Sequence, residues 1–430
     1  MRIELISTGN ELLTGDITDT NASWLAQQLT ESGFKLRRKT TIADDLEQLA
    51  QAFVERASCA DFIIVNGGLG PTSDDLSAAA AGIALNEPLQ LFDAWLQQIR
   101  IKFSRMQRTM HDSNIKQAML PKSAEIIDNP VGTACGFYIE LSGCGLLFTP
   151  GVPREFKVMV EQQVLPKLIE RSQLSQVPHS ALRIERYLCF SIGESALAQR
   201  LEPLSLPNGV ELAYRAAMPF IELKVFADQT INIDSLLQQI ERIIAEFCVV
   251  KQGNSLSLHV HQLLANAAQP QGLKFAAVES CTGGLVSDSL IQYSGSSAYL
   301  DRGLVTYSNH AKTQLAAVND ATIERYGAVS CEVAQQMAEG ALHKWQLDLT
   351  VAITGVAGPT GGSEHKPVGT VAFALATAES CQTQLLYFPN RGRDAIRQLA
   401  TAVALDMVRR YLIGLPAAAD YASFSGKRID

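Results

Sequence analysis

Short apolar runs alternate with amphipathic segments along the first part of the chain. Residues 3–6, apart from Glu4, and residues 62–65 are apolar over the length of a buried strand, whereas residues 21–32 and 46–57 carry apolar positions at helical spacing. Strands and helices that alternate in this way are typical of a layered α/β domain with a mainly parallel sheet. The pattern therefore predicts such a domain over residues 1–171.

Two polar stretches, residues 172–180 and 251–257, divide the rest of the chain and have the composition of linkers. The order of elements expected between them is strand 183–190, helix 194–201, strands 210–214 and 220–226, and helix 234–247. This order predicts a small α+β module over residues 182–250. Another α/β domain is expected over residues 258–415, so the predicted fold class is α/β with an α+β module between two α/β domains.

The last helix has the clearest pattern in the chain. Its apolar stripe, with spacings of three and four, comprises Ile396, Leu399, Ala400, Val403 and Met407. Asp394 suits the positive N-terminal end of this helix, and Arg409 and Arg410 suit its C-terminal end. Residues 416–430 are expected to form a loose tail.

Composition narrows the class of protein. The chain of 430 residues is 47% hydrophobic and 19% charged, as in soluble globular proteins. Its formal charge of -8 disfavours nucleic acid or an anionic membrane as a partner. None of the eight cysteines forms a Cys-x-x-Cys pair, which disfavours a zinc site or a disulfide framework. Because no signal peptide or membrane-spanning run is visible, we expect a cytoplasmic protein.

The sequence ESCTGG, residues 279–284, connects strand 274–278 to a segment with helical spacing. Such a turn presents backbone N–H groups at the edge of a sheet. Gly283 and Gly284 would let a ligand approach the backbone, so the turn is a candidate site for a phosphate or for the oxyanion of acyl transfer. A Gly-Gly pair before a helix is, on its own, more often simple turn chemistry.

Other segments add candidate groups near the ends of strands. GLVTYSNHAK, residues 303–312, brings Tyr307 and Lys312 close to a strand end, and TGVAGPTGG, residues 354–362, leaves another strand as a glycine-rich loop. NRGRDAIRQ surrounds a helix start with Arg391, Arg393 and Arg397. Guanidinium groups can bind a phosphate in a bidentate manner, although a solvated basic helix end is an equal alternative.

These motifs, with KPVGTV after the glycine-rich loop, occur in an order and spacing that resembles the CinA C-terminal domain, also known as the nicotinamide mononucleotide deamidase (PncC) family. The resemblance covers residues 258–415. It implies a serine/lysine amidohydrolase without a cofactor, in which Ser280 is the nucleophile and Lys312 the general base. The implied substrate is nicotinamide mononucleotide, and the implied contacts are Thr282, Gly283, Gly284, Tyr307, Thr354, Gly355, Arg393 and Arg397.

Such a mechanism places a demand on the lysine. An amine with a pKa near 10.4 is only about 0.04% neutral at pH 7, so the pKa of Lys312 must fall by roughly 3 units. Burial or a neighbouring cation can cause such a shift.

Other residues offer rival chemistry to this pair. Cys281 is a possible nucleophile, but its position next to Ser280 favours a packing role. His259 and His261 do not share a helix face and are expected at the surface rather than on a metal.

A second glycine turn follows strand 61–65. In NGGLGPTSDD, residues 66–75, the glycine amides could bind a diphosphate while Asp74 or Asp75 coordinates a divalent ion. Thr72 and Asp75 also have the spacing of a capping box, so helix capping is an alternative.

Three segments around this turn, STGNELLTGDITDTN, NPVGTACGF and TPGVPREF, resemble the N-terminal CinA domain of the molybdopterin-binding fold superfamily. With a KH-like middle module, the resemblance to the CinA family covers almost the whole chain, although Asn10 stands where Asp is usual. It implies an ADP-ribose pyrophosphatase that uses a divalent metal ion held by Asp74 and Asp75. The implied nucleotide contacts are Glu11, Gly67, Gly68, Gly70, Thr72, Lys116, Asn129 and Gly132.

Two other interpretations stay open. The N-terminal half could bind a pterin or nucleotide without catalysis, or the whole chain could be a non-enzymatic partner in DNA uptake or recombination. The acidic charge and the lack of a Gly-x-x-Gly loop in residues 182–250 count against direct DNA binding. The resemblance also implies a homodimer.

Overall fold

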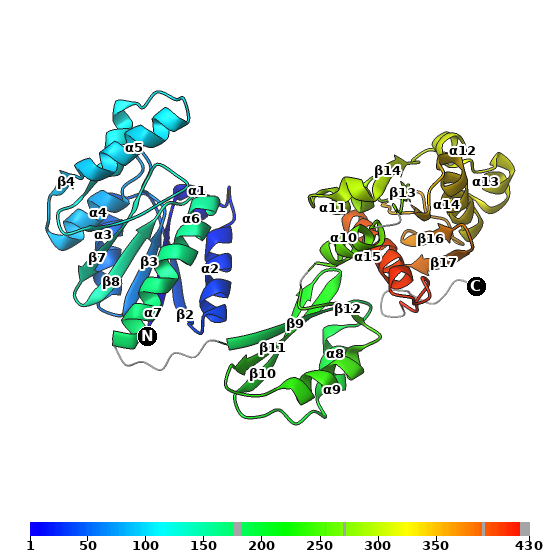
Figure 1. Cartoon of the computed structure of the whole chain (residues 1–430), viewed down its shortest axis with the longest axis horizontal. Helices are drawn as coiled ribbons and strands as arrows, with labels where there is room; N and C mark the ends of the chain where they lie inside the picture. The colour runs from blue at the N-terminus through cyan, green and yellow to red at the C-terminus, as the bar shows by residue number, and fades with distance from the viewer. Residues whose placement is uncertain (175–181, 254, 270–271, 389–391, 422–430) are drawn as a thin grey trace. The chain divides into compact units, whose positions relative to one another are not determined.

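The computed structural model describes residues 1–174, 182–253, 255–269, 272–388 and 392–421 (Figure 1). The chain forms two compact units, Met1–Arg183 with Asp228–Ile231, and Ile184–Ala227 with Asn232–Asp430. None of the described helices is both long and apolar enough to cross a membrane.

A six-stranded sheet with the order β2-β1-β3-β8-β7-β6 forms the centre of the first unit. Its strands are β1 (Ile3–Thr8), β2 (Leu36–Ile42), β3 (Phe62–Asn66), β6 (Glu125–Ile127), β7 (Gly136–Leu141) and β8 (Cys144–Thr149). The four strands β2, β1, β3 and β8 are parallel, whereas β7 pairs antiparallel with β8 and β6 pairs antiparallel with β7. Because β2 and β3 lie on opposite sides of β1, the strand order reverses at β1. Open α/β sheets bind ligands at the carboxyl ends of the strands beside such a switch point.

Helices cover both faces of this sheet (Figure 1). They are α1 (Asn10–Thr14), α2 (Thr20–Glu31), α3 (Leu46–Ala57), α4 (Ser77–Leu85), α5 (Asp93–Arg105), α6 (Pro153–Met159) and α7 (Leu165–Leu174), with helical turns at Asp112–Ala118 and Val160–Val164 and a small hairpin of β4 (Leu89–Leu91) and β5 (Met119–Pro121). Leu5 packs with α2 and α6, whereas its neighbour Ile6 packs with α3. Alternate side chains of β1 thus enter different cores, which explains why the neighbours Leu5 and Ile6 are both apolar.

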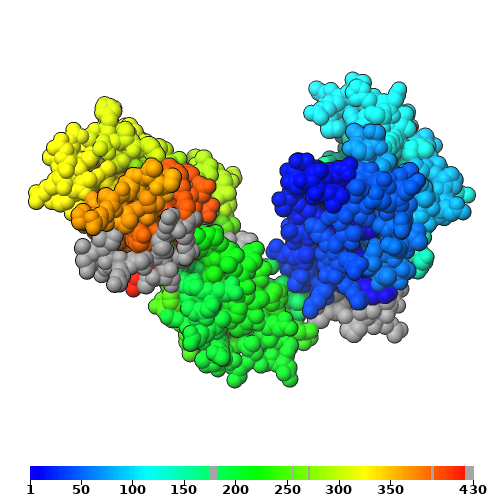
Figure 2. Space-filling model, turned by 180° about the vertical axis from the view of Figure 1, so that it is seen from behind, coloured from blue at the N-terminus to red at the C-terminus, as the bar shows by residue number. Residues whose placement is uncertain are grey.

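The middle module is a four-stranded sheet of order β10-β11-β9-β12 with two helices. Its elements are β9 (Leu182–Cys189), α8 (Glu194–Leu201), β10 (Val210–Ala217), β11 (Phe220–Asp228), α9 (Asp234–Ile244) and β12 (Cys248–Lys251). The sequence pattern did not predict β12. This strand pairs antiparallel with β9, and Cys248 lies opposite Cys189 in the register. Leu188 and Phe190 share a core with the C-terminal helices, and the green module abuts that part of the chain in Figure 2.

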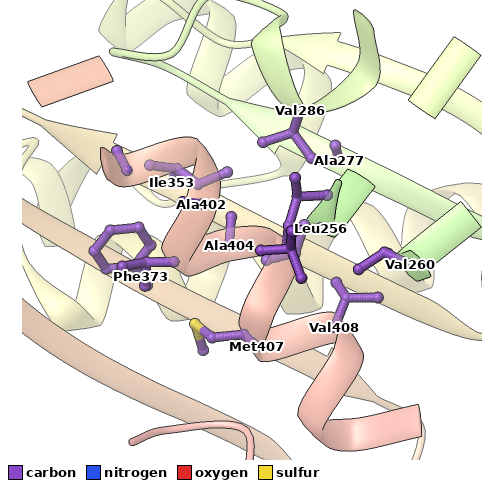
Figure 3. Packing of buried hydrophobic residues seen from close by; sticks show 14 of the residues in the cluster. Leu256, Val260, Ala277, Val286, Ile353, Phe373, Ala402, Ala404, Met407 and Val408 are labelled. Atoms are coloured by element: carbon purple, nitrogen blue, oxygen red, sulfur yellow. The ribbon is translucent and has the colours of Figure 1, made fainter. Parts of the chain in front are cut away.

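The C-terminal sheet has the order β14-β13-β15-β16-β17. Its strands are β13 (Phe275–Glu279), β14 (Leu300–Val305), β15 (Leu349–Gly355), β16 (Thr370–Thr377) and β17 (Cys381–Tyr387), and its helices are α10 (Leu256–Ala267), α11 (Leu285–Ile291), α12 (Asn309–Ala316), α13 (Asp320–Tyr326), α14 (Cys331–Trp345) and α15 (Arg393–Leu412), with a short turn at Ser296–Ala298. β14, β13 and β15 are parallel, so their carboxyl ends meet at one edge. Figure 3 shows Phe373 of the sheet packed with Leu256 of α10 and Met407 of α15 in one core.

The expectation of a loose tail is wrong for residues 416–421. Tyr421 is 2% exposed, and its hydroxyl donates to Asp406 Oδ2 at 2.8 Å. Arg409, expected as a charge at the helix end, is also buried and donates to Asp406 Oδ1 at 2.7 Å. The tail folds back because the Tyr421 ring packs on Phe190 with the ring centroids 5.4 Å apart. Residues 422–430 and 175–180 of the expected tail and linker lie outside the described residues.

Candidate active sites

Ser280 and Lys312 meet at the carboxyl edge of the C-terminal sheet. Ser280 begins the turn after β13, and Lys312 lies on α12, just beyond the neighbouring parallel strand β14. Lys312 Nζ is 3.0 Å from Ser280 Oγ and donates to the carbonyl oxygen of Thr306 at 2.8 Å. The parallel pairing of two strands thus brings together residues that are 32 positions apart.

Lys312 is almost completely buried, with 2% of its surface exposed. Burial disfavours the charged ammonium and lowers its pKa from 10.5 to about 8, while the neighbouring Cys281 has a smaller opposite effect. With a pKa near 8, about a tenth of the amine is neutral at pH 7. Burial rather than a nearby cation is the cause of this shift.

Glu279 fixes the turn that carries Ser280. Its fully buried carboxylate accepts hydrogen bonds from the backbone N–H groups of Gly284, Val286 and Ser287 at 3.0, 3.1 and 2.9 Å, and from the Ser287 hydroxyl at 2.8 Å. These N–H groups lie at the start of α11, where backbone N–H groups have no acceptor within the helix. Glu279 was not among the predicted site residues, although a carboxylate just before a helix start is a visible signal.

Most of the predicted substrate contacts lie around this turn. Arg397 Nη2 donates to the Thr282 carbonyl oxygen at 3.0 Å, whereas Arg393 donates to the Gly358 carbonyl oxygen at 2.7 Å and to the exposed Tyr307 hydroxyl at 3.2 Å. The Thr282 hydroxyl is buried and has no partner among the described residues. Arg391 lies outside the described residues.

Four predicted contacts have backbone or packing roles in the structure. Gly283 and Gly284 adopt φ values of +63° and +99°, which favour glycine in the turn itself. Thr354 is 1% exposed, and its hydroxyl donates to the Ala328 carbonyl oxygen at 2.8 Å. At Gly355, a Cβ atom would lie 2.7 Å from Val371 and 3.0 Å from Cys281 Sγ. Thr354 and Gly355 therefore have structural roles here, and their contacts with a substrate stay predictions.

Cys281 is a packing residue, as expected. It is 5% exposed, and burial raises the pKa of its thiol to about 12, so the reactive thiolate is scarce at neutral pH. His259 and His261 are partly buried rather than fully exposed, and His261 Nδ1 lies 2.9 Å from the Tyr299 hydroxyl. Among the described residues, no three His, Cys, Asp or Glu side chains form a cluster that could hold a metal ion.

The first unit has a hollow of about 440 Å³ at the carboxyl ends of β1, β3 and β8. Its wall includes the predicted residues Glu11, Gly67, Gly68, Gly70, Asp74 and Asp75. Asp44 and Glu155, which were not among the predicted site residues, bring the number of carboxylates in the wall to five. Asp44 follows β2 at the same sheet edge, so its position directly after a strand was an available signal.

The carboxylates around this hollow have different surroundings. Burial raises the pKa of Asp44, and the nearby negative charges of Glu11, Asp74 and Asp75 add to the effect, although a bond from the Asn10 N–H at 2.9 Å opposes it. Asp75 Oδ2 instead accepts from the Thr72 N–H at 2.8 Å and from its hydroxyl. These bonds hold the turn before α4, but the capping interpretation is wrong, because α4 begins at Ser77 with Leu76 as its N-cap and has no side-chain cap.

Three other predicted nucleotide contacts shape the loops in this structure. The Asn129 amide donates to Ala134 O and Glu155 Oε2 at 2.7 and 2.8 Å, and its Oδ1 accepts from the Val131 and Gly132 N–H groups at 3.1 and 3.0 Å. Gly132 itself lies directly against the Glu155 carboxylate, which leaves no space for a Cβ atom. Lys116 Nζ donates to the Thr72 carbonyl oxygen. These bonds give Asn129, Gly132, Thr72 and Lys116 loop-holding roles in the structure, and their contacts with a nucleotide stay predictions.

Known proteins match the chain over both units. The family model of the CinA C-terminal domain matches residues 257–412, and that of a probable molybdopterin binding domain matches residues 4–170. A CinA-like protein of Shewanella woodyi is 47% identical over 428 residues, which are 99% of each chain. The chain belongs to the CinA family. The resemblance carried by its motifs is thereby confirmed.

Other CinA proteins are also similar to this chain. A CinA-like protein of Shewanella loihica is 46% identical over 99% of each chain. The solved structure of the competence/damage inducible protein CihA from Agrobacterium tumefaciens is 38% identical, with 36% of this chain and 94% of that chain covered and a TM-score of 0.35. Within the CinA layout, Ser280 and Lys312 lie in the matched C-terminal domain, and the carboxylate-lined hollow lies in the matched molybdopterin binding domain.

Proposed function

We propose that the C-terminal domain hydrolyses the carboxamide of nicotinamide mononucleotide, with Ser280 as the nucleophile and Lys312 as the general base. The observation that carries this proposal is the 3.0 Å separation of Ser280 Oγ from a buried amine with a pKa of about 8. A serine hydroxyl is a weak nucleophile unless a base removes its proton, and a lysine serves only when it is partly neutral.

In the proposed reaction, Ser280 Oγ attacks the carboxamide carbon while its proton moves to Lys312 Nζ. The ammonium then returns that proton to the leaving nitrogen, and ammonia departs from a nicotinoyl ester of Ser280. Water, activated by the same amine, cleaves the ester and yields nicotinic acid mononucleotide. The Thr306 carbonyl oxygen accepts a hydrogen bond from Lys312 Nζ and so keeps the amine beside Ser280. The Thr282 hydroxyl, which has no partner among the described residues, is a candidate donor to the oxyanion.

Arg393 and Arg397 support a phosphorylated substrate. They stand at the start of α15 and are tied to the Gly358 loop and to the Thr282 carbonyl oxygen of the nucleophile turn. The test is ammonia release by the full chain, with a chelator present, from nicotinamide mononucleotide, nicotinamide riboside and nicotinamide. We expect turnover of the mononucleotide and at least about 100-fold lower kcat/KM without the phosphate. Lack of ammonia from all three would refute the proposal.

The rate should follow the protonation of Lys312. Its pKa is lowered to about 8, so the neutral base is scarce below this pH and dominant above it. We expect kcat/KM to rise about tenfold per pH unit up to about pH 8 and then to level off. The measurement is a pH profile between 6 and 10, and a flat profile across pH 7 to 9 would exclude Lys312 as the base.

The hollow of the first unit supports a second activity, the hydrolysis of ADP-ribose to AMP and ribose 5-phosphate. Mutual repulsion among Glu11, Asp44 and Asp74 fits a divalent cation, which those carboxylates would hold. Among the described residues no three carboxylates form a cluster that could hold a metal ion by themselves, so the proposed cation would take further ligands from the substrate phosphates. Such an ion would neutralise charge on the diphosphate. The Gly68 amide is a candidate donor to the diphosphate, whereas the Gly67 N–H already donates to the Thr149 carbonyl oxygen at 2.9 Å.

Asp44→Asn should lower AMP formation from ADP-ribose by at least about 100-fold, because it removes a negative charge from the wall of the hollow. Asp45→Asn is the matched control. Asp45 caps α3 by accepting from the Gln48 N–H at 2.9 Å and does not line the hollow, and asparagine caps a helix equally well. Chromatography of the products with magnesium present measures the effect. Equal rates for the two variants would contradict the role of Asp44, whereas nucleotide binding without turnover would favour a binding module.

A further inference from the structure

A second hollow of about 280 Å³ lies beside the carboxylate-lined one in the first unit. The two share Thr8, Glu11 and Gly151 in their walls, so they are adjacent. The second hollow extends toward the start of α2, where Thr20 and Asn21 line it together with Asn66 at the end of β3. Its wall shares Glu11 with the first hollow but does not include Asp44, Asp74 or Asp75.

Two buried polar atoms in this wall have no hydrogen-bond partner among the described residues. They are Thr8 Oγ1 and Asn21 Oδ1, from side chains that are 6% and 5% exposed. The amide nitrogen of Asn21 donates to the Gly151 carbonyl oxygen at 2.8 Å, which fixes the side chain and leaves Oδ1 as an acceptor. A buried polar atom without a partner costs free energy, so such atoms in a hollow indicate a ligand that completes their bonds.

The two hollows differ in charge. The first has five carboxylates, whereas the second has only Glu11 and Asp19. Asp19 is already engaged, since it accepts from the Ala22 N–H and the Ser7 hydroxyl and pairs with Lys39 at 3.0 Å. A metal-bound diphosphate therefore fits the first hollow, and a neutral group fits the second.

The walls also define the shape of that group. Leu12, Ile17 and Pro153 supply apolar surface, which suits the faces of a flat ring, while Asn21 Oδ1 requires an N–H or O–H donor. Of the two ends of ADP-ribose, only adenine combines apolar faces with an exocyclic amino group; the terminal ribose offers hydroxyls alone.

We propose that the second hollow is the adenine subsite, in which Asn21 Oδ1 accepts from the exocyclic amino group of the base and Thr8 Oγ1 bonds to the nucleoside. The identity of this ligand rests on the proposed hydrolysis of ADP-ribose.

The test is calorimetric binding of AMP and IMP, with magnesium present, to the full chain and its variants. IMP has a carbonyl in place of the amino group, so wild type should bind AMP at least about tenfold more tightly. Ile17→Ser should weaken AMP binding about five- to tenfold by removing apolar surface. Leu13→Ser is the matched control, because Leu13 is equally exposed on α1 but lines neither hollow, and its AMP affinity should stay within about twofold.

Thr8→Val and Asn21→Leu complete the set. Thr8→Val removes a hydroxyl that has no partner within the described protein, so it should weaken AMP binding without lowering the melting temperature. Asn21→Leu should abolish the preference for AMP over IMP. Equal binding of AMP and IMP by wild type, or unchanged AMP affinity in both Ile17→Ser and Thr8→Val, would overturn the subsite.

The outcomes also separate this inference from the proposed activity. If ADP-ribose is cleaved but Ile17→Ser and Thr8→Val keep the wild-type KM, the subsite is wrong and the hydrolase stands. If AMP binds with the expected pattern but ADP-ribose is not cleaved, the subsite stands and the hydrolase is wrong.

Discussion

Ser280→Ala and Lys312→Met should each lower ammonia release from nicotinamide mononucleotide by at least about 10³-fold. The first removes the atom that attacks the carboxamide. The second removes the only amine that the structure places beside that atom within the described residues, with Nζ 3.0 Å from Ser280 Oγ. Because the two groups act as one unit, the double variant should be no slower than either single variant.

Cys281→Ala is the control for this experiment. Cys281 lies in the same turn but is buried against Gly355, and its high pKa keeps it as a thiol. Its removal should leave kcat/KM within about threefold, with some loss of stability from the small cavity. Loss of activity in Cys281→Ala alone, with Ser280→Ala active and all variants folded, would indicate a cysteine amidase instead.

The sequence predicted the layers of the fold because both α/β domains have strands that are buried on two faces. Runs such as residues 3–6 and 62–65 show this burial directly, and both are strands in the structure. β12 was missed because four residues after a helix carry too little periodicity to separate a strand from a linker. The buried tail was missed because Tyr421 is held by tertiary contacts with Phe190 and Asp406, which have no local signal.

The candidate sites show a similar division. The motifs brought Ser280 and Lys312 forward as a pair, and the structure places them in contact. Sequence could not show the pKa of Lys312, because burial depends on how α12 packs against the sheet. Asn129 and Thr354 were assigned to ligands because they lie in the quoted motifs, yet their polar groups bond to the protein itself. Residues that shape a loop and residues that contact a ligand are equally prominent in a motif.

Lys312→Met should also make the second unit more stable at pH 7, by up to about 3 kcal/mol. Folding transfers the lysine from water to a site where its pKa is about 8 rather than 10.5, so the folded state carries a penalty for the charged amine. Methionine has similar length and no charge. Part of the gain is offset because the Thr306 carbonyl oxygen loses its donor, at a cost of roughly 1 kcal/mol.

The pH dependence identifies the cause of that gain. Below pH 8 both states hold the proton and wild type bears the full penalty. Between about pH 8 and 10.5 the folded state has lost the proton while the unfolded state still binds it, so wild-type stability rises with pH relative to the variant. Melting temperatures at pH 7 and pH 10 measure this, with Lys274→Met as the control at an exposed lysine of the same unit. If the melting temperature of Lys312→Met exceeds that of wild type by several degrees at pH 7 and by less at pH 10, the protein keeps its buried lysine at the expense of stability. If Lys312→Met melts below wild type at both pH values, the hydrogen bonds of the amine outweigh the cost of burying it.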